Sequence, residues 1–171
     1  MFTKKDFDFL QEMGKLKSVI RFEGKYWDDY AMPRRESVAD HTWRMAFMLV
    51  FFKEHISVCF DFEKTMKMIL IHDLPEIRTG DIPLMSDLRK QKDFAEQKSQ
   101  NEKQVFSQMF SGYSEEFLEI FEEFEAKESI EAKLVNNLDR IEGAFQAYEY
   151  FQSIGKINQE HLQTALDRWE K

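Results

Sequence analysis

Residues 130–153, IEAKLVNNLDRIEGAFQAYEYFQS, form the stretch of sequence that decides the fold. Large apolar residues return in it at intervals of four and three positions, which is the period of an α-helix with one buried face. These residues are Leu134, Leu138, Ile141, Phe145 and Tyr148. Ser129 precedes the stretch, where an N-cap residue is preferred, and Gly155 follows it, where helices commonly end. The pattern predicts a helix over about 130–153 that packs into a core.

The remainder of the chain also favours helices. The expected further helices cover residues 3–22, 38–56, 62–72, 86–110 and 158–169, together with one that begins at Ser114. Two stretches without a period, 23–37 and 74–85, contain most of the Gly and Pro residues and are expected to be loops. No segment alternates like a strand, and six Gly and three Pro are few for an all-β fold. The sequence therefore predicts a compact all-α fold in which residues 1–171 form one domain.

Composition excludes several classes of protein. With 24 Lys and Arg against 32 Asp and Glu, the 171-residue chain carries a net charge of −8, which argues against nucleic acid and anionic membranes as partners. A hydrophobic content of 43% is enough for a full core, so wholesale disorder is excluded. Cys59 is the only cysteine, so the chain cannot form an internal disulfide. The absence of a signal-like or membrane-spanning apolar run predicts a cytoplasmic protein.

Four ionisable residues lie at positions where a helical core is expected. His41 precedes three inward-facing residues of the 38–56 helix by 4, 7 and 11 positions. Asp73 follows the apolar stripe of the 62–72 helix, and His72 is its neighbour, about 100° around the axis. Asp139 lies beside the apolar seam of the 130–153 helix. Three helices would thus bring two imidazoles and two carboxylates towards one point.

Such a set of nitrogen and oxygen ligands suits a divalent metal ion such as Mn, Co, Zn, Fe or Mg. Each residue also has a simpler interpretation. His41 alone is more often a hydrogen-bonded core histidine, the pair His72-Asp73 occurs by chance, and Asp139 can form a surface ion pair with Arg140. Together, however, the residues would need several independent explanations, because an unpaired buried charge is costly. The combination favours a metal site.

The same residues carry a resemblance to a known family. Their order resembles that of the HD-domain metal phosphohydrolases, and the surrounding motifs look like the 5′-deoxynucleotidase subgroup, which includes bacterial YfbR-type enzymes and the eukaryotic HD domain-containing protein 2 type. The motifs are RESVADH at 35–41, RMA at 44–46, HDLPE at 72–76, GDI at 80–82 and EAKLVNNLD at 131–139. The resemblance runs from about residue 16 to 150.

The resemblance implies an all-α HD fold, usually dimeric, that hydrolyses deoxyribonucleoside 5′-monophosphates. It implies that the catalytic divalent metal is held by His41, His72, Asp73 and Asp139. Glu76 and Asp81 match acidic positions that act on the attacking water and the leaving group, or that hold a second metal together with the backbone carbonyl of Ile82. Glu76 follows Asp73 by three residues, close enough to orient a water as general base.

An acidic protein also needs local cations to bind a phosphate. Arg21, Arg35 and Arg44 are the candidates, since a guanidinium matches a phosphate better than an ammonium does, and each can instead be a surface charge. Trp27 is a candidate for the aromatic substrate contact, because Phe22 stands where the bacterial pattern has tryptophan. This departure from the bacterial pattern leaves base and sugar preference open.

Two other functions fit the sequence less well. One is an HD phosphohydrolase for another substrate, such as a cyclic nucleotide, a nucleoside triphosphate or an alarmone. The other is a non-catalytic helical interaction module with a structural metal. The complete ligand set and the presence of Glu76 and Asp81 favour the 5′-nucleotidase.

Overall fold

The computed structural model describes residues 1–21, 34–82, 88–156 and 163, and within them the all-α prediction is confirmed. This part of the chain contains no β-strand, only an isolated antiparallel bridge between Ile20 and Ser37. Two of its elements are short 3₁₀ helices, and none of its helices is long and apolar enough to cross a membrane. In chain order the elements are α1 (Lys4–Met13), η1 (Gly14–Ser18), α2 (Val38–Phe52), η2 (Lys53–His55), α3 (Phe62–Ile71), α4 (Glu76–Thr79), α5 (Leu88–Met109), α6 (Glu115–Ala126) and α7 (Ile130–Ser153).

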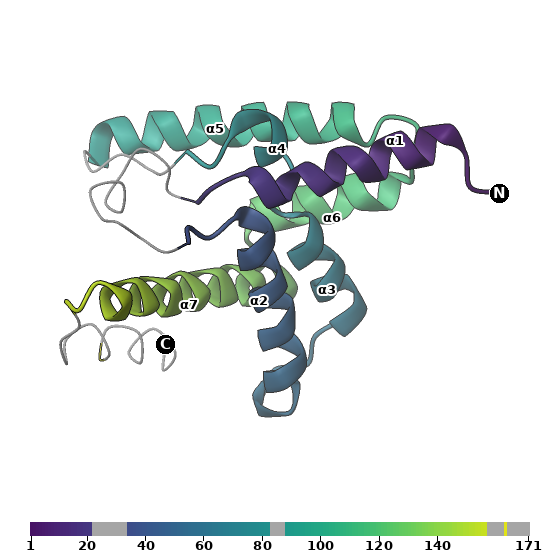
Figure 1. Cartoon of the computed structure of the whole chain (residues 1–171). Helices are drawn as coiled ribbons and strands as arrows, with labels where there is room; N and C mark the ends of the chain where they lie inside the picture. The colour runs from purple at the N-terminus through teal and green to yellow at the C-terminus, as the bar shows by residue number, and fades with distance from the viewer. Residues whose placement is uncertain (22–33, 83–87, 157–162, 164–171) are drawn as a thin grey trace.

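Three helices form the framework of the molecule. In Figure 1, α2 and α3 run side by side and α2 crosses α7, and these three helices contact one another in pairs. Helix α6 packs on both α3 and α7, while α5 lies along the top of the view and contacts α6 and the short α4. Because α2, α3 and α7 carry the predicted ligands, their mutual packing determines where those ligands meet.

Helix α7 has the predicted bounds. The side-chain oxygen of Ser129 accepts a hydrogen bond from the backbone N–H of Ala132 at 3.1 Å, which caps the helix. Leu138 and Ile141 are buried as predicted, whereas Phe145, farther along the seam, is partly exposed. In α3, Leu70 is half-exposed, whereas Met68 and Ile69 are completely buried.

The first helix ends much earlier than predicted, at Met13 instead of about Phe22. Gly14 begins a short 3₁₀ helix, and the chain then becomes extended through the β-branched Val19 and Ile20. This extended segment pairs with the start of α2, since the backbone N–H of Arg21 donates to the carbonyl oxygen of Glu36 at 3.0 Å. The break in the helix therefore brings Arg21 to the N-terminal end of α2.

The start of α2 is fixed by a capping box. The backbone N–H of Asp40 donates to the Ser37 hydroxyl at 3.2 Å, and the Asp40 carboxylate accepts the backbone N–H of Ser37 at 2.9 Å. His41 follows in the first turn of the helix and is completely buried.

The predicted loop 74–85 contains a helical turn, α4. Pro75 has a helical backbone and no N–H to leave unpaired, so it suits the beginning of this turn. Gly80 ends the turn at φ +74°, a left-handed conformation that favours glycine. Most of the 23–37 loop, Trp27, Ser86 and nearly all of the predicted 158–169 helix lie outside the described residues.

Candidate metal centre

Four predicted ligands converge from three parts of the fold. His41 comes from the first turn of α2, His72 and Asp73 follow α3, and Asp139 belongs to α7. The Nε2 atom of His41 lies 3.2 Å from Asp139 Oδ1 and 3.7 Å from Asp73 Oδ2. The Nε2 atom of His72 lies 3.1 Å from Asp73 Oδ2. Ligand atoms of His41, His72 and Asp73 all lie within 4.8 Å of one another, so a single ion can be bound by them.

Each of the two histidines directs its Nε2 atom towards the place where the predicted ligands meet. The Nδ1–H of His72 donates to the carbonyl oxygen of Ile69 at 2.7 Å, and Nδ1 of His41 is hydrogen-bonded to a carboxylate oxygen of Glu142. Both Nε2 atoms are buried and lack a hydrogen bond of acceptable geometry, which is unusual for buried polar atoms. Nδ1 protonation leaves the Nε2 lone pair free to bind a metal, and carboxylate and carbonyl partners commonly orient ligating histidines in this way. The donor set therefore fits a divalent cation.

Glu142 is the main residue of the site that the sequence analysis missed. Its carboxylate is completely buried and, besides His41, accepts the Nε–H of Arg44 at 2.8 Å and contacts Nη1 of Arg21 at 3.4 Å. Burial alone would raise the pKa of Glu142, but its bond to His41 and the two arginines hold that pKa below its usual range. The available signal was spacing, because Glu142 lies three residues after Asp139 and thus on the same side of α7.

Protonation reflects the same contacts. Burial disfavours the charged form of His41, but the adjacent carboxylates of Asp139 and Glu142 outweigh this effect and raise the pKa of His41 to about 9. Although burial opposes ionisation of Asp73, the adjacent His72 lowers the pKa of this carboxyl. In the metal-free protein, a proton on His41 thus partly neutralises the carboxylates of the site, as a bound cation would do.

Arg21 lies inside the site, among three carboxylates. Its side chain is only 11% exposed, with Nη2 3.7 Å from Asp139 Oδ1 and Nε 3.8 Å from Asp81 Oδ2, in addition to the Glu142 contact. Arg35 contacts the backbone of Arg21, since its Nη2–H donates to the carbonyl oxygen of Arg21 at 3.1 Å. Ile82, another predicted site residue, directly follows Asp81 and is 45% exposed.

Arg44, also predicted to bind substrate, is surrounded by acceptors from its own chain. Its guanidinium bonds to Glu142, to Glu149 at 2.8 Å, to Glu36 at 3.3 Å and to Gln146. This arrangement holds Glu142 against His41.

Glu76 is buried on the α4 side of the site. Burial and the nearby carboxylates of Asp73 and Asp81 raise the pKa of Glu76 to about 10 in the metal-free protein, and a cation bound close by would favour its ionised form. Nζ of Lys98 lies 3.3 Å from Glu76 Oε1. The many charged residues of the predicted 86–110 helix, which include Lys98, indicate from the sequence alone a helix that is largely exposed to solvent. That expectation is wrong for Lys98, whose side chain is 24% exposed.

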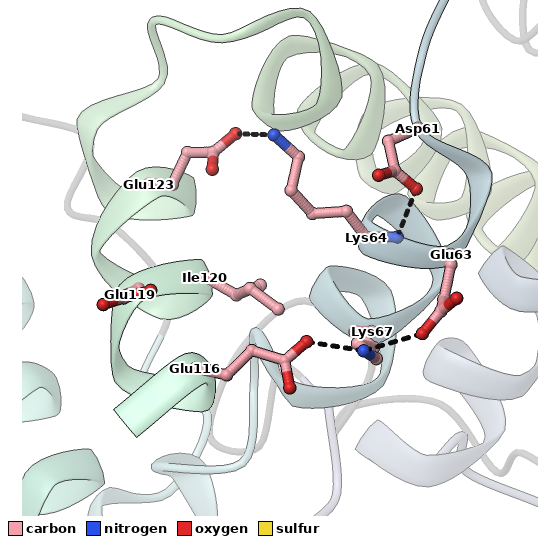
Figure 2. A pocket seen from close by; sticks show the side chains of 8 residues that line it. All are labelled: Asp61, Glu63, Lys64, Lys67, Glu116, Glu119, Ile120 and Glu123. Carbon is pink, nitrogen blue, oxygen red and sulfur yellow. Dashed lines mark hydrogen bonds and ion pairs between the residues drawn. The ribbon is translucent and has the colours of Figure 1, made fainter. Parts of the chain in front are cut away.

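A separate charged hollow of about 320 Å³ lies between α3 and α6 (Figure 2). Its two lysines are held in ion pairs, Lys64 with Glu123 at 2.8 Å and Lys67 with Glu63 at 2.8 Å and with Glu116. None of the predicted site residues lines it. It therefore belongs to the surface packing of α3 on α6.

Comparison with known proteins agrees with this geometry. A family model described as HD domain matches residues 13–170. The 5′-deoxynucleotidase HDDC2 of Danio rerio is 36% identical over 152 residues, which are 86% of this chain and 70% of that protein. The chain spans about two thirds of the length of the vertebrate relatives that it matches.

Solved structures show the same fold. The PH0347 protein from Pyrococcus horikoshii OT3 matches with a TM-score of 0.70 and 29% identity over 96% of this chain and 85% of that one. A structure titled as a predicted metal-dependent phosphohydrolase, from Magnetospirillum magnetotacticum MS-1, matches with a TM-score of 0.68 and 24% identity over 97% of this chain and 84% of that one. The family match over residues 13–170 and the Danio rerio relative show that the chain belongs to the HD-domain family, and the grouping of His41, His72 and Asp73 agrees with it.

Proposed function

We propose that this protein hydrolyses deoxyribonucleoside 5′-monophosphates to a nucleoside and inorganic phosphate, with a divalent metal ion as cofactor. The observation that carries the proposal is the pair of buried, unpartnered Nε2 atoms of His41 and His72 beside the carboxylates of Asp73 and Asp139. The name of the Danio rerio relative, 5′-deoxynucleotidase, supports the substrate class.

His41, His72, Asp73 and Asp139 would hold the metal, which we expect to be Mn, Co, Zn, Fe or Mg. A divalent cation there would supply Lewis acidity towards the phosphate and lower the pKa of a coordinated water. Hydrolysis of a phosphomonoester depends mainly on positioning and charge neutralisation, which the residues of the site would supply.

The remaining residues take the following roles in the proposal. Glu76 orients the attacking water and accepts its proton as the water oxygen bonds to phosphorus. Asp81 delivers a proton to the 5′ oxygen as the bond from that oxygen to phosphorus breaks. Arg21 neutralises charge on the phosphate, which is supported by its position beside the predicted ligand Asp139 and beside Asp81. In an alternative arrangement Glu76, Asp81 and the carbonyl of Ile82 hold a second metal.

The other predicted substrate contacts are Trp27, Arg35 and Arg44. Arg35 donates to the backbone of Arg21, so it can act on the phosphate by holding Arg21. The four acceptors around Arg44 favour a role in holding Glu142 over direct contact with substrate.

Phosphate release by the metal-loaded protein tests the proposal. The purified chain, loaded in turn with Mn, Co, Zn, Fe or Mg, is assayed with deoxyribonucleoside and ribonucleoside 5′-monophosphates, 3′-monophosphates, a cyclic nucleotide, nucleoside triphosphates, an alarmone and p-nitrophenyl phosphate. Preferred release from the deoxyribonucleoside 5′-monophosphates supports it. Faster turnover of a cyclic nucleotide, a triphosphate or an alarmone would identify another HD phosphohydrolase, and no release from any substrate would favour a non-catalytic module.

The variant Asp73→Ala links the metal to the reaction. Because Asp73 lies next to both imidazoles, its loss is expected to abolish bound metal and turnover together, as read by elemental analysis and phosphate release. Asp8→Ala serves as a control, since Asp8 is an exposed aspartate of α1 outside the site. Full metal content in Asp73→Ala would show that the ligand assignment is wrong.

We also propose that the protein forms a homodimer through an exposed aromatic ladder on α2. The ladder consists of Trp43, Phe47 and Phe51, which are spaced by four residues and are 54–66% exposed. Ring centroids lie 5.8 Å apart between Trp43 and Phe47 and 5.9 Å apart between Phe47 and Phe51, with nearly parallel planes.

Two further expectations stay predictions from the sequence. One is a cytoplasmic location, and the other is that the partner is a small nucleotide rather than nucleic acid or a membrane.

The exposed area of the ladder would form the apolar centre of such a two-fold interface rather than the whole of it. Fully buried aromatic side chains cover about 150–250 Å² each, so the ladder presents roughly 350 Å². A two-fold contact between ladders would cover roughly 700 Å², more than half of the lower limit of about 1,200 Å² for a specific interface. The surrounding rim of α2 would have to supply the rest.

A further inference from the structure

Two charged residues of α5 lie on the side of the helix that faces the molecule. Lys98 and Glu102 belong to the same stripe as Phe94, Val105 and Met109, with spacings of four, four, three and four residues. The side chain of Lys98 is 24% exposed and that of Glu102 is 14% exposed. The periodicity of α5 therefore directs an ammonium and a carboxylate towards the interior.

The Lys98 ammonium lies between two carboxylates. Its Nζ is 3.3 Å from Glu76 Oε1 on one side and 3.4 Å from Glu102 Oε1 on the other. Glu76 is buried, and the carboxylates of Asp73 and Asp81 oppose its ionisation. Lys98 is thus a cation from outside the HD motifs that binds Glu76 directly.

The local structure around Glu76 makes this contact important. Glu76 begins α4, a helix of only four residues that ends at Gly80. Repulsion from Asp73 and Asp81 would turn a free Glu76 carboxylate away from them, and a helix this short offers little packing to resist that rotation. An ammonium bound to Oε1 restricts the rotation and leaves Oε2 to act on water.

We propose that Lys98 is a positioning residue for Glu76, and that Glu102 holds Lys98 in place. The inference rests on the proposed function, in which Glu76 is the general base. A competing role for Lys98 is direct binding of the substrate phosphate. The two roles differ in what they predict, because a positioning residue affects the chemical step through Glu76, whereas a phosphate ligand affects substrate binding independently of Glu76.

The test compares Lys98→Met, Lys98→Arg and Lys103→Met in the Mn-loaded enzyme with a deoxyribonucleoside 5′-monophosphate. Methionine keeps the hydrocarbon part of the side chain, and Lys103 is an exposed lysine of the same helix, so Lys103→Met is the matched control. Lys98→Met is expected to lower kcat about 10–100-fold with KM and metal content unchanged, the usual range for losing an outer partner of a site. Lys98→Arg should recover part of the loss, and Lys103→Met should match wild type.

A double-variant cycle with Glu76→Gln separates the two roles. If Lys98 acts through Glu76, adding Lys98→Met to Glu76→Gln lowers turnover no further. An equal fold-loss in both backgrounds, or a raised KM with kcat unchanged, would overturn the proposal in favour of a phosphate ligand. Wild-type turnover by Lys98→Met would also overturn it while leaving the nucleotidase intact. Absence of phosphate release by the wild-type enzyme would instead defeat the proposed function itself.

Discussion

At the scale of single residues, Glu142 connects the ligand His41 to the arginines of the site. It accepts a hydrogen bond from Nδ1 of His41 and is itself held by Arg44 and Arg21. A ligating histidine oriented by a carboxylate binds metal more tightly, because its tautomer and ring position are already set. The contribution of Glu142 is therefore made through His41.

Replacing Glu142 by Gln should weaken metal binding without removing a ligand. We expect the dissociation constant for Mn to rise about 10–100-fold, since the amide is a poorer acceptor for Nδ1–H. Competition with a chelator measures the constant, and circular dichroism checks the fold. Glu149→Gln is the control, because exposed Glu149 also pairs with Arg44 but does not contact His41. Unchanged affinity in Glu142→Gln would show that His41 needs no such partner.

The raised pKa of His41, about 9 in the metal-free protein, predicts proton release on metal binding. At pH 7 the imidazole is protonated, and it must lose that proton to bind a cation. We expect at least one proton to be released per ion, and apparent affinity to increase with pH until about pH 9. Titration calorimetry in buffers of different ionisation enthalpy counts these protons.

The exposed His55 provides the control for this measurement. His55→Gln should release the same number of protons as wild type. A binding enthalpy at pH 7 that does not depend on the buffer would contradict protonation of His41.

At the scale of secondary-structure elements, the first turn of α2 places a ligand, and the capping box of Ser37 and Asp40 determines where that turn begins. Helix α6 offers a comparison. The Ser114 hydroxyl caps it by accepting the backbone N–H of Glu116, and α6 carries none of the predicted ligands. The two caps are chemically similar but differ in what their helices carry.

Ser37→Ala and Ser114→Ala should therefore have different consequences. Each removes a cap and is expected to lower the free energy of unfolding by about 1 kcal/mol. For a chain of this size that corresponds to a fall in Tm of about 2–4 °C, measured by thermal melting. Only Ser37→Ala should also weaken metal binding, because only α2 presents His41. Equal metal affinity in the two variants would show that the cap does not position the ligand.

Sequence periodicity predicted much of this arrangement. His41, Asp73 and Asp139 follow apolar stripes, so the interior position of each could be inferred from its own helix. Lys98 lies on such a stripe too, but the many charges of α5 concealed it. The end of α1 was missed because the bond between Arg21 and Glu36 joins segments distant in sequence, and no local pattern reports such pairing.

At the scale of the whole molecule, the aromatic ladder of α2 exposes a large apolar surface that association would remove from water. Isolated exposed apolar residues are ordinary, but three stacked aromatic rings on one helix form a continuous patch. A net charge of −8 on each copy opposes association, so salt should favour the dimer by screening.

Phe47→Lys tests the proposed dimer. A charge in the middle of the ladder should convert the dimer to a monomer, as measured by light scattering coupled to size-exclusion chromatography. Phe7→Lys makes the same change at another half-exposed phenylalanine, on α1, and should leave the dimer intact. A wild-type chain that is monomeric at all concentrations and salt levels would exclude this interface.

The two imidazoles of the centre are oriented by different kinds of group, one on the main chain and one on a side chain. His72 is oriented by the main-chain carbonyl of Ile69, an oxygen that every amino acid provides, so random drift at position 69 cannot delete that support. His41 is oriented by the side chain of Glu142, which a single codon change can remove. Substitutions at position 142 should consequently weaken metal binding by removing the partner of His41, whereas substitutions at position 69 keep the carbonyl oxygen that orients His72.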